Sequence, residues 1–414
     1  MKERIAILDG IRTPFVKSDG IFKHLDADDL GAIVVKEILA RTGLGVNEID
    51  EVIFGNVAQP IHASNVSRVI ALKAGLPFSS IAHTVNRNCA SGMQSITAGA
   101  LQIVSGESEI IITGGTESMS NIPLVFRPQM KDFFFSMLKA KSKIDKLKVL
   151  FSFRLRYLNP IIGVEKGLTD PICGMIMGLT AEVLSREFKI TRKEQDEFAL
   201  LSHKRAVAAI KAGRLAEEII PVPVPPDYSS IQMVDDSPRE SQTMEALQKL
   251  KPYFDRKTGT ITVGNSCPLS DGAAAVILCS EQKAIELGIK PIGYLKAFAY
   301  AGLDGSRMGL GPYYATEILM KKTGLTMKDF DLIEINEAFA AQIIANERIY
   351  KGALDRERLN VNGGAIALGH PVGASGTRLV ITLLKEMRRR QKQTGLASLC
   401  VGGGQGASLA LELE

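Results

Sequence analysis

ILARTGLGVNEIDEVIFGN at residues 38–56 and EILMKKTGLTMKDFDLIEIN at residues 317–336 are two versions of one pattern. Each passes from a helical stretch through Thr-Gly-Leu to a short β-rich run that ends in asparagine. Aligning Thr42 with Thr323 sets an offset of 281 residues between the two copies. An internal repeat of this size predicts a chain built from two related halves.

The same offset relates other parts of the chain. In the aligned halves, His370 is equivalent to Cys89 and Gly373 is equivalent to Gly92. Each pair lies in a turn that is followed by a helical pattern. DGAAAVILCS (271–280) also resembles QGASLALELE (405–414), so the first half should close near residue 280. We therefore predict halves at 1–284 and 285–414, with an insertion at about 121–260 in the first. Alternating strands and helices throughout predict an α/β protein.

Composition narrows the class of protein. A net charge of +5 over 414 residues does not suggest a nucleic-acid partner. The five cysteines form no CxxC pair, which indicates free thiols, a reducing compartment and no metal site. The first residues lack the apolar core of a secretory signal, and no run of eighteen apolar residues occurs. We therefore expect a cytoplasmic protein, with peripheral membrane contact as an alternative.

Three residues stand out for their chemistry. Cys89 lies in a small-residue turn just before a helical pattern, where the positive end of a helix would lower the pKa of the thiol and favour a thiolate. His370, at the equivalent position of the other half, could take the proton of Cys89. Cys400 precedes a glycine run that would let backbone N–H groups approach a ligand. By contrast, Cys279 lies in an apolar run, and we predict that it is a buried residue of the hydrophobic core.

Five motifs, taken together, resemble those of the thiolases in order and spacing: NRNCASG (86–92), GGTESMS (114–120), NEAFAAQ (336–342), GGAIALGHPVGASG (363–376) and CVGGGQG (400–406). The resemblance implies two pseudo-symmetric βαβαβαββ halves in five layers, α-β-α-β-α, with an inserted loop domain. It implies thiolytic cleavage of a 3-ketoacyl-CoA by CoA, or the reverse Claisen condensation. CoA would be a substrate, no metal or redox cofactor would be needed, and the protein would form dimers or tetramers.

By the same resemblance, Cys89 carries the acyl group, His370 activates it, and Cys400 is the acid/base at the α-carbon, for which a pKa near the operating pH is expected. Asn336 would hold a water in one oxyanion hole, and the N–H groups of Cys89 and Gly402 would form the other. Contacts with the substrate are expected from Met177, Val263, Cys267, Ala338 and Phe339. Cys267 stands where a serine commonly touches CoA, and Ile176 where many short-chain thiolases carry histidine.

Other readings stay open at this point. The leading interpretation is a degradative 3-ketoacyl-CoA thiolase of fatty-acid β-oxidation. A short-chain acetyl-CoA acetyltransferase is the alternative within the family. A decarboxylating ketoacyl synthase is disfavoured by the second cysteine, Cys400. A non-catalytic lipid carrier is disfavoured because Cys89, His370, Cys400 and Asn336 are all present.

The segment RPQMKDFFFSMLKAKSKIDKLKVLFSFRLRYLNP (127–160) departs from the rest of the chain. It carries nine Lys and Arg residues against two Asp, a net charge of +7. Apolar residues from Met137 to Leu158 recur at helical spacing and predict one amphipathic helix. Such a helix could bind a membrane surface or a hydratase–dehydrogenase partner, or pack on the body near CoA. The segment resembles the insertion in the beta subunit of the trifunctional fatty-acid oxidation complex, although that group usually has His where this chain has Asn336.

Overall fold

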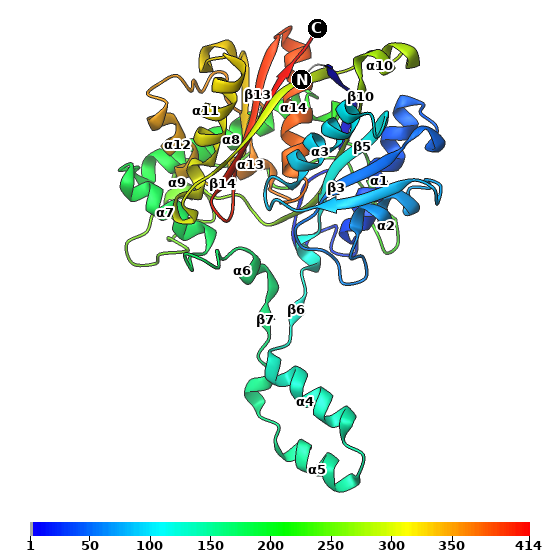
Figure 1. Ribbon diagram of the computed structural model, residues 1–414. Helices are drawn as coiled ribbons and strands as arrows, with labels where there is room; N and C mark the ends of the chain where they lie inside the picture. Colours follow the sequence, from blue (N-terminus) through cyan, green and yellow to red (C-terminus); the bar gives the residue numbers. More distant parts are fainter. Residues whose placement is uncertain (1–2) are drawn as a thin grey trace.

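The structure is a computed structural model that describes residues 3–414. The N-terminal half of the chain is built around a five-stranded mixed sheet (Figure 1). Its order is β4-β3-β5-β10-β1. Strand β3 is parallel to β4 and β5, whereas β10 is antiparallel to β5 and β1. The strands are β1 (Ile5–Arg12), β3 (Glu51–Gly55), β4 (Ile81–Val85), β5 (Ile110–Glu117) and β10 (Ser270–Ser280), and the short β2 (Val16–Lys17) pairs with β10.

The C-terminal half repeats this plan with one strand fewer. Its order is β12-β13-β14-β11, from strands β11 (Gly293–Gly302), β12 (Leu332–Ile335), β13 (Thr394–Val401) and β14 (Gln405–Glu412). Where the predicted βαβαβαββ order requires a strand beside β12, only a single parallel bridge joins Ile333 to Leu359. β1 pairs with β11 over three residues, so the two sheets are continuous.

Six helices complete five layers around these sheets. α1 (Ala27–Thr42) and α2 (Val66–Lys73) cover the outer face of the first sheet, and α11 (Gly311–Thr323) and α12 (Ala340–Ile349) lie on the far side of the second half. α3 (Ser91–Ser105) and α14 (Ser375–Arg390) lie between the sheets, because both are apolar enough to share one core with strands of both halves. The predicted α/β fold in five layers is confirmed.

The insertion lies between β5 and β10. Its body part contains α6 (Gly163–Gly167), α7 (Met177–Glu187), α8 (Arg192–Lys211), α9 (Met244–Gln248) and a ladder of β8 (Val222–Pro223) with β9 (Ile231–Gln232). Arg12 of β1 anchors it: the buried guanidinium donates to Glu218 at 2.7 Å and to both oxygens of Asp235. Two further helices, α10 (Glu281–Leu287) and α13 (Ala365–Leu368), connect the main elements.

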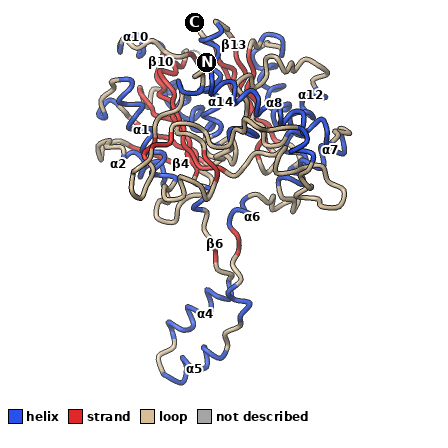
Figure 2. Tube along the Cα trace, turned by 180° about the vertical axis from the view of Figure 1, so that it is seen from behind, coloured by secondary structure: helices blue, strands red, loops and turns tan. Residues whose placement is uncertain are grey.

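An arm projects from the body at residues 124–162 (Figures 1 and 2). Strands β6 (Leu124–Val125) and β7 (Ile161–Ile162) form its antiparallel stalk, and α4 (Pro128–Lys139) and α5 (Lys143–Phe151) form a hairpin beyond it. The single amphipathic helix expected here is wrong. The chain leaves the helix at Ala140, and the Ser142 side chain accepts the N–H of Asp145 at 3.0 Å as the N-cap of a second helix.

The interpretation in which this segment packs on the body is also wrong. Leu138 is 80% exposed and Phe151 is 75% exposed, and both views show the helices clear of the sheets. Within residues 3–414, no helix combines the length and the apolar character needed to cross a membrane.

Candidate active site

Cys89 lies in the turn between β4 and α3. The residue before it, Asn88, has a left-handed φ of 44°, a conformation that asparagine adopts more readily than most residues. Its side-chain amide donates to the carbonyl of Gly402, in the other half, at 2.7 Å. The N–H groups of Gly402 and of Cys89 itself reach the Cys89 sulfur. Segments far apart in the sequence therefore meet at this thiol.

The expected resting thiolate is wrong. Burial raises the pKa of Cys89 above its ordinary value, and the nearby Glu117 carboxylate adds to that increase, against the opposing effect of the two backbone N–H groups. Cys89 is therefore a neutral thiol at rest. Its proton has to leave as the sulfur attacks, which requires a base at hand.

His370 has the tautomer that such a base needs. Its Nδ1 lies 2.6 Å from the Ser375 oxygen, and the Ser375 hydroxyl donates to the carbonyl of Pro371 at 2.9 Å. With that hydroxyl hydrogen directed at Pro371, Nδ1 donates to Ser375 and the lone pair is on Nε2, which agrees with the amide donor of Asn336 that faces Nε2. Burial, with a smaller contribution from Arg378, lowers the pKa of His370 to about 3. The imidazole is therefore neutral and able to accept a proton.

Asn336 follows β12 and faces the histidine. Its Nδ2 lies 3.4 Å from His370 Nε2, and its backbone N–H donates to Ser398 at 3.0 Å. Within the described residues the Oδ1 atom is buried and has no hydrogen-bond partner. Buried polar atoms are rarely left unpaired, so this atom fits a site that receives a polar group of substrate or solvent.

The turns that carry Cys89 and His370 are in direct contact. A Cβ on Gly92 would lie 2.8 Å from the Gly373 oxygen, so only glycine lets the turns approach this closely. Thr377 of α14 donates to the Gly92 carbonyl at 3.1 Å. The pseudo-equivalent positions found in the sequence thus meet where the two halves pack.

Cys400 and Cys267 bring two further thiols to the site. Cys400 is buried at the end of β13, and burial, together with Cys89 and Cys267 nearby, raises its pKa well above the ordinary value. The expected pKa near the operating pH is therefore wrong for the unliganded site, and Cys400 is a neutral thiol. The backbone N–H of Cys267 donates to Ala338 at 3.1 Å, and burial raises the pKa of its thiol to about 12.

The other predicted substrate residues fall into two groups. Met177, Ala338 and Phe339 lie near the catalytic side chains. The Met177 sulfur is 3.2 Å from the position that a Cβ on Gly402 would take. The backbone of Phe339 forms an isolated β-bridge with Ser266. Val263 instead is 62% exposed. It lines a pocket of about 150 Å³ whose other residues include three basic side chains, Lys17, His203 and Arg239.

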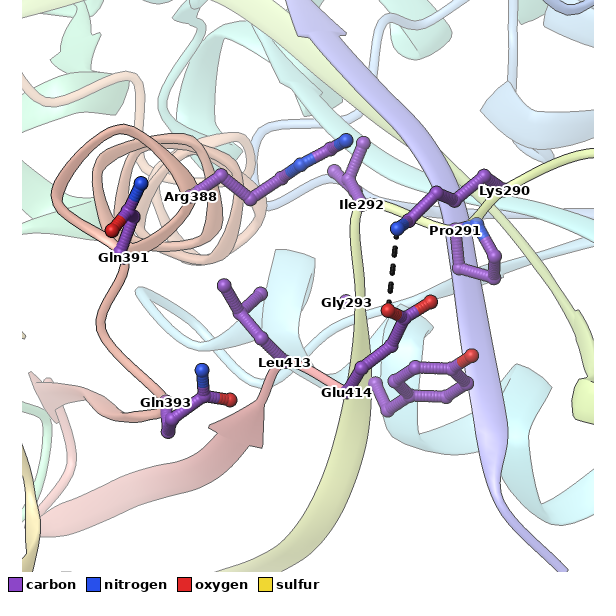
Figure 3. A pocket seen from close by; sticks show the side chains of 10 residues that line it. Lys290, Pro291, Ile292, Gly293, Arg388, Gln391, Gln393, Leu413 and Glu414 are labelled. Atoms are coloured by element: carbon purple, nitrogen blue, oxygen red, sulfur yellow. Dashed lines mark hydrogen bonds and ion pairs between the residues drawn. The ribbon is translucent and has the colours of Figure 1, made fainter.

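Another pocket, of about 230 Å³, lies at the C-terminal end of the chain (Figure 3). Residues near the start of β11 and the ends of α14 and β14 line it, and Lys290 pairs with Glu414 across it at 3.2 Å. None of its lining residues belongs to the predicted site.

Sequence reasoning missed three residues that hold the site. Asn88 anchors Gly402, Ser375 fixes the histidine tautomer, and the Ser270 hydroxyl accepts the backbone N–H of His370 at 3.2 Å. Ser375 lies in the same motif as His370, so that motif could have pointed to it. Asn88 likewise lies in the motif of Cys89, whereas Ser270 acts across the fold and lies in none of the five motifs.

Comparison with known proteins identifies the family of the chain. The thiolase N-terminal domain matches residues 5–282 and the thiolase C-terminal domain matches residues 289–413. A 3-ketoacyl-CoA thiolase of Shewanella halifaxensis is 40% identical over all of this chain and 97% of its own length. An acetyl-CoA acetyltransferase of Syntrophomonas wolfei is 42% identical over all of both chains.

Solved structures give the same result. The Bacillus anthracis acetyl-CoA acetyltransferase superposes with a TM-score of 0.90 at 37% identity, covering 99% of this chain and 98% of that one. Human mitochondrial 3-ketoacyl-CoA thiolase in complex with CoA superposes with a TM-score of 0.89 at 36% identity, covering 100% and 98%. The chain therefore belongs to the thiolase family of enzymes.

Proposed function

We propose that this enzyme cleaves 3-ketoacyl-CoA with CoA through an acyl group carried on Cys89, and that its role is degradative. One observation carries the proposal: the partly buried Cys89 thiol, the buried Cys400 thiol and a neutral imidazole whose Nε2 faces the Asn336 amide lie where turns from both halves of the chain meet. Relatives named 3-ketoacyl-CoA thiolase support this substrate class.

In the first half-reaction, the Cys89 sulfur attacks the 3-keto carbon while His370 Nε2 takes the thiol proton. The oxyanion that forms is stabilised by N–H groups aimed at it. The carbon–carbon bond then breaks, and the electron pair moves into the enolate of acetyl-CoA. Cys400 gives its proton to that enolate, acetyl-CoA leaves, and the shortened acyl group stays on Cys89.

In the second half-reaction, the Cys400 thiolate takes the proton of the incoming CoA thiol. The CoA sulfur attacks the acyl group and the bond to Cys89 breaks. The Cys89 sulfur recovers its proton from His370, so the protein returns to its starting state. Two thiols are needed because one holds the acyl group while the other moves the proton.

Intact-mass spectrometry after mixing with acetoacetyl-CoA tests this scheme. The wild type should carry one acetyl group, and Cys89→Ser should carry none that turns over with CoA. Cys279→Ser is the matched control, since Cys279 is buried in the core of the first half and should leave acylation intact. A Cys89→Ser variant that still acylates and turns over would contradict the proposal.

The acyl length follows from kcat/KM for acetoacetyl-CoA and for a C16 3-ketoacyl-CoA, measured side by side. We expect a preference for the longer substrate, as in fatty-acid degradation. A preference for acetoacetyl-CoA would instead identify a short-chain acetyl-CoA acetyltransferase, a name that other relatives carry.

We also infer that the arm binds anionic membrane surfaces. Its net charge is +7, and large apolar side chains are exposed on both helices, among them Phe135, Leu138, Leu147 and Phe151. Apolar insertion and attraction to anionic lipid together give peripheral binding, and each basic residue near such a surface adds about 1 kcal/mol. Long-chain acyl-CoA substrates would be concentrated at the same surface.

Co-sedimentation with vesicles tests this inference. The wild type should pellet with vesicles of phosphatidylcholine and phosphatidylglycerol but not with phosphatidylcholine alone. Replacing Lys139, Lys141, Lys143, Lys146 and Lys148 by Gln should abolish binding. The same change at Lys321 and Lys322 of α11, on the body, is the control. A wild type that pellets with neither vesicle would contradict membrane binding, and arm-dependent self-association would favour an assembly contact.

A further inference from the structure

We propose that Glu117 is a positioning residue that locks the His370 turn of the C-terminal half onto the N-terminal half and thereby aligns His370 with Cys89. This inference rests on the roles proposed above for those two residues. Glu117 touches neither reacting group through a hydrogen bond; it acts through the backbone between them.

The Glu117 carboxylate joins two segments that are distant in the sequence. It is the last residue of β5 and is 1% exposed. Oε1 accepts from the Asn56 side chain at 3.0 Å and from the Ala58 N–H at 2.9 Å. Oε2 accepts from the Val57 N–H at 3.1 Å and from the Gly373 N–H at 2.9 Å. All four partners are donors, so the site requires an ionised carboxylate.

Gly373 lies midway in the turn between His370 and the Ser375 that sets its tautomer. This turn has no free space around it. A Cβ on Gly373 would lie 2.5 Å from the Thr116 oxygen and 2.8 Å from the Gly55 oxygen, and a Cβ on Gly115 would overlap the Gly373 carbonyl. Glu117 and Ser270 are the two side chains of the N-terminal half that bond the backbone of this turn in the described structure. A shift of about 1 Å in such a catalytic group can cost a hundredfold in rate.

The charge of Glu117 also acts on Cys89. The carboxylate is one of the causes that raise the pKa of the Cys89 thiol. Removing the charge should therefore make resting Cys89 more reactive to alkylation, while the misplaced histidine should slow turnover. General unfolding would also expose the Cys89 thiol and slow turnover, so each variant must first show the wild-type circular dichroism spectrum at the assay temperature. Burial raises the pKa of Glu117 itself to about 7, so the comparison belongs at pH 8, where the carboxylate is largely ionised.

Two variants separate the effect of the Glu117 charge from the effect of its hydrogen bond to Gly373. Glu117→Gln keeps the shape but turns an NH₂ group toward backbone donors, and kcat for thiolysis of acetoacetyl-CoA should fall about tenfold to a hundredfold with KM unchanged. Its Cys89 should react with iodoacetamide at least as fast as in the wild type. Glu117→Asp keeps the charge but withdraws it from Gly373, so kcat should fall while the alkylation rate stays at the wild-type value.

Glu51→Gln is the matched control. Glu51 is also buried, begins strand β3 and bonds the half-buried His83 at 2.6 Å, so its loss should cost stability without changing kcat. Circular dichroism at the assay temperature shows that each variant is folded, and kcat is expressed per folded protomer. Unchanged kcat in both Glu117 variants, or an equal loss in Glu51→Gln, would overturn the inference. Absence of an acetyl group on wild-type Cys89 would instead refute the proposed function.

Discussion

At the scale of single residues, Ser375 decides which nitrogen of His370 can act. It holds the proton on Nδ1 by offering an oxygen whose own hydrogen is committed to Pro371. We predict that Ser375→Ala populates the other tautomer and lowers kcat by about tenfold to a hundredfold, the usual range for weakened acid–base catalysis. Ser375→Thr keeps the hydroxyl and should retain most of the activity. Steady-state thiolysis measures both, and equal kcat in Ala and Thr variants would contradict this role.

Cys400 should show its role in proton exchange rather than in acylation. We predict that Cys400→Ser still takes an acetyl group from acetyl-CoA but exchanges the α-protons of acetyl-CoA with D₂O at least a hundredfold more slowly, because a hydroxyl is a far weaker acid than a thiol. Proton NMR follows the exchange. Cys267→Ser is the control, since that partly buried thiol lies close to Cys400 but has no proposed proton to move. Wild-type exchange in Cys400→Ser would remove Cys400 from the mechanism.

Sequence reasoning could find the residues whose side-chain type suits the chemistry and whose position recurs in both halves of the chain. The offset of 281 residues led to His370 and to Gly373, and the contact between Gly92 and Gly373 shows why the two turns keep glycine. Glu117 could not be assigned a role in this way. Its partners are mostly backbone N–H groups from both halves, which have no signature in the sequence.

At the scale of elements, the arm shows where periodicity fails. Apolar residues keep a helical spacing across residues 137–158, yet the chain breaks at 140–142 because Ser142 can cap a new helix. Spacing alone cannot distinguish one long helix from two helices in a hairpin, since the two share the same local pattern. Exposure of the apolar side chains could not be foreseen either, because it depends on the stalk holding the hairpin away from the body.

The arm should be removable without loss of the enzyme. Val125 and Ile161 face each other in the antiparallel stalk, so Asn-Gly can replace residues 126–160 as a two-residue hairpin turn. We predict an unchanged melting temperature, within about 2 °C, and unchanged thiolysis of acetoacetyl-CoA, because α4 and α5 pack mainly on each other and on residues 155–158. Vesicle binding should be lost. Calorimetry and the acetoacetyl-CoA assay check this, and loss of short-chain activity would show that the arm supports the site.

At the scale of the whole molecule, the two pseudo-equivalent sheet edges differ. At one end, β12 is fully buried and is bridged by Leu359; at the other, β4 pairs only with β3 within the described structure. Large apolar side chains are exposed around β4, including Phe78 (85%), Ile81 and, on α3, Leu101. An open edge strand with exposed apolar neighbours is a hazard that proteins usually cover.

We predict that a second copy of the chain covers this edge. An antiparallel pairing of β4 with its own copy is isologous, so one two-fold axis closes the assembly and covers the β4 edge of both copies. Light scattering after size exclusion should therefore give at least two protomers for the wild type. Ile81→Lys combined with Leu101→Lys should shift the mass to one protomer, because charged side chains on the edge and the adjoining helix oppose pairing. Ile172→Lys, at a 93% exposed side chain of the insertion, is the control and should leave the mass unchanged. A monomeric wild type, or a double variant of unchanged mass, would contradict pairing through β4.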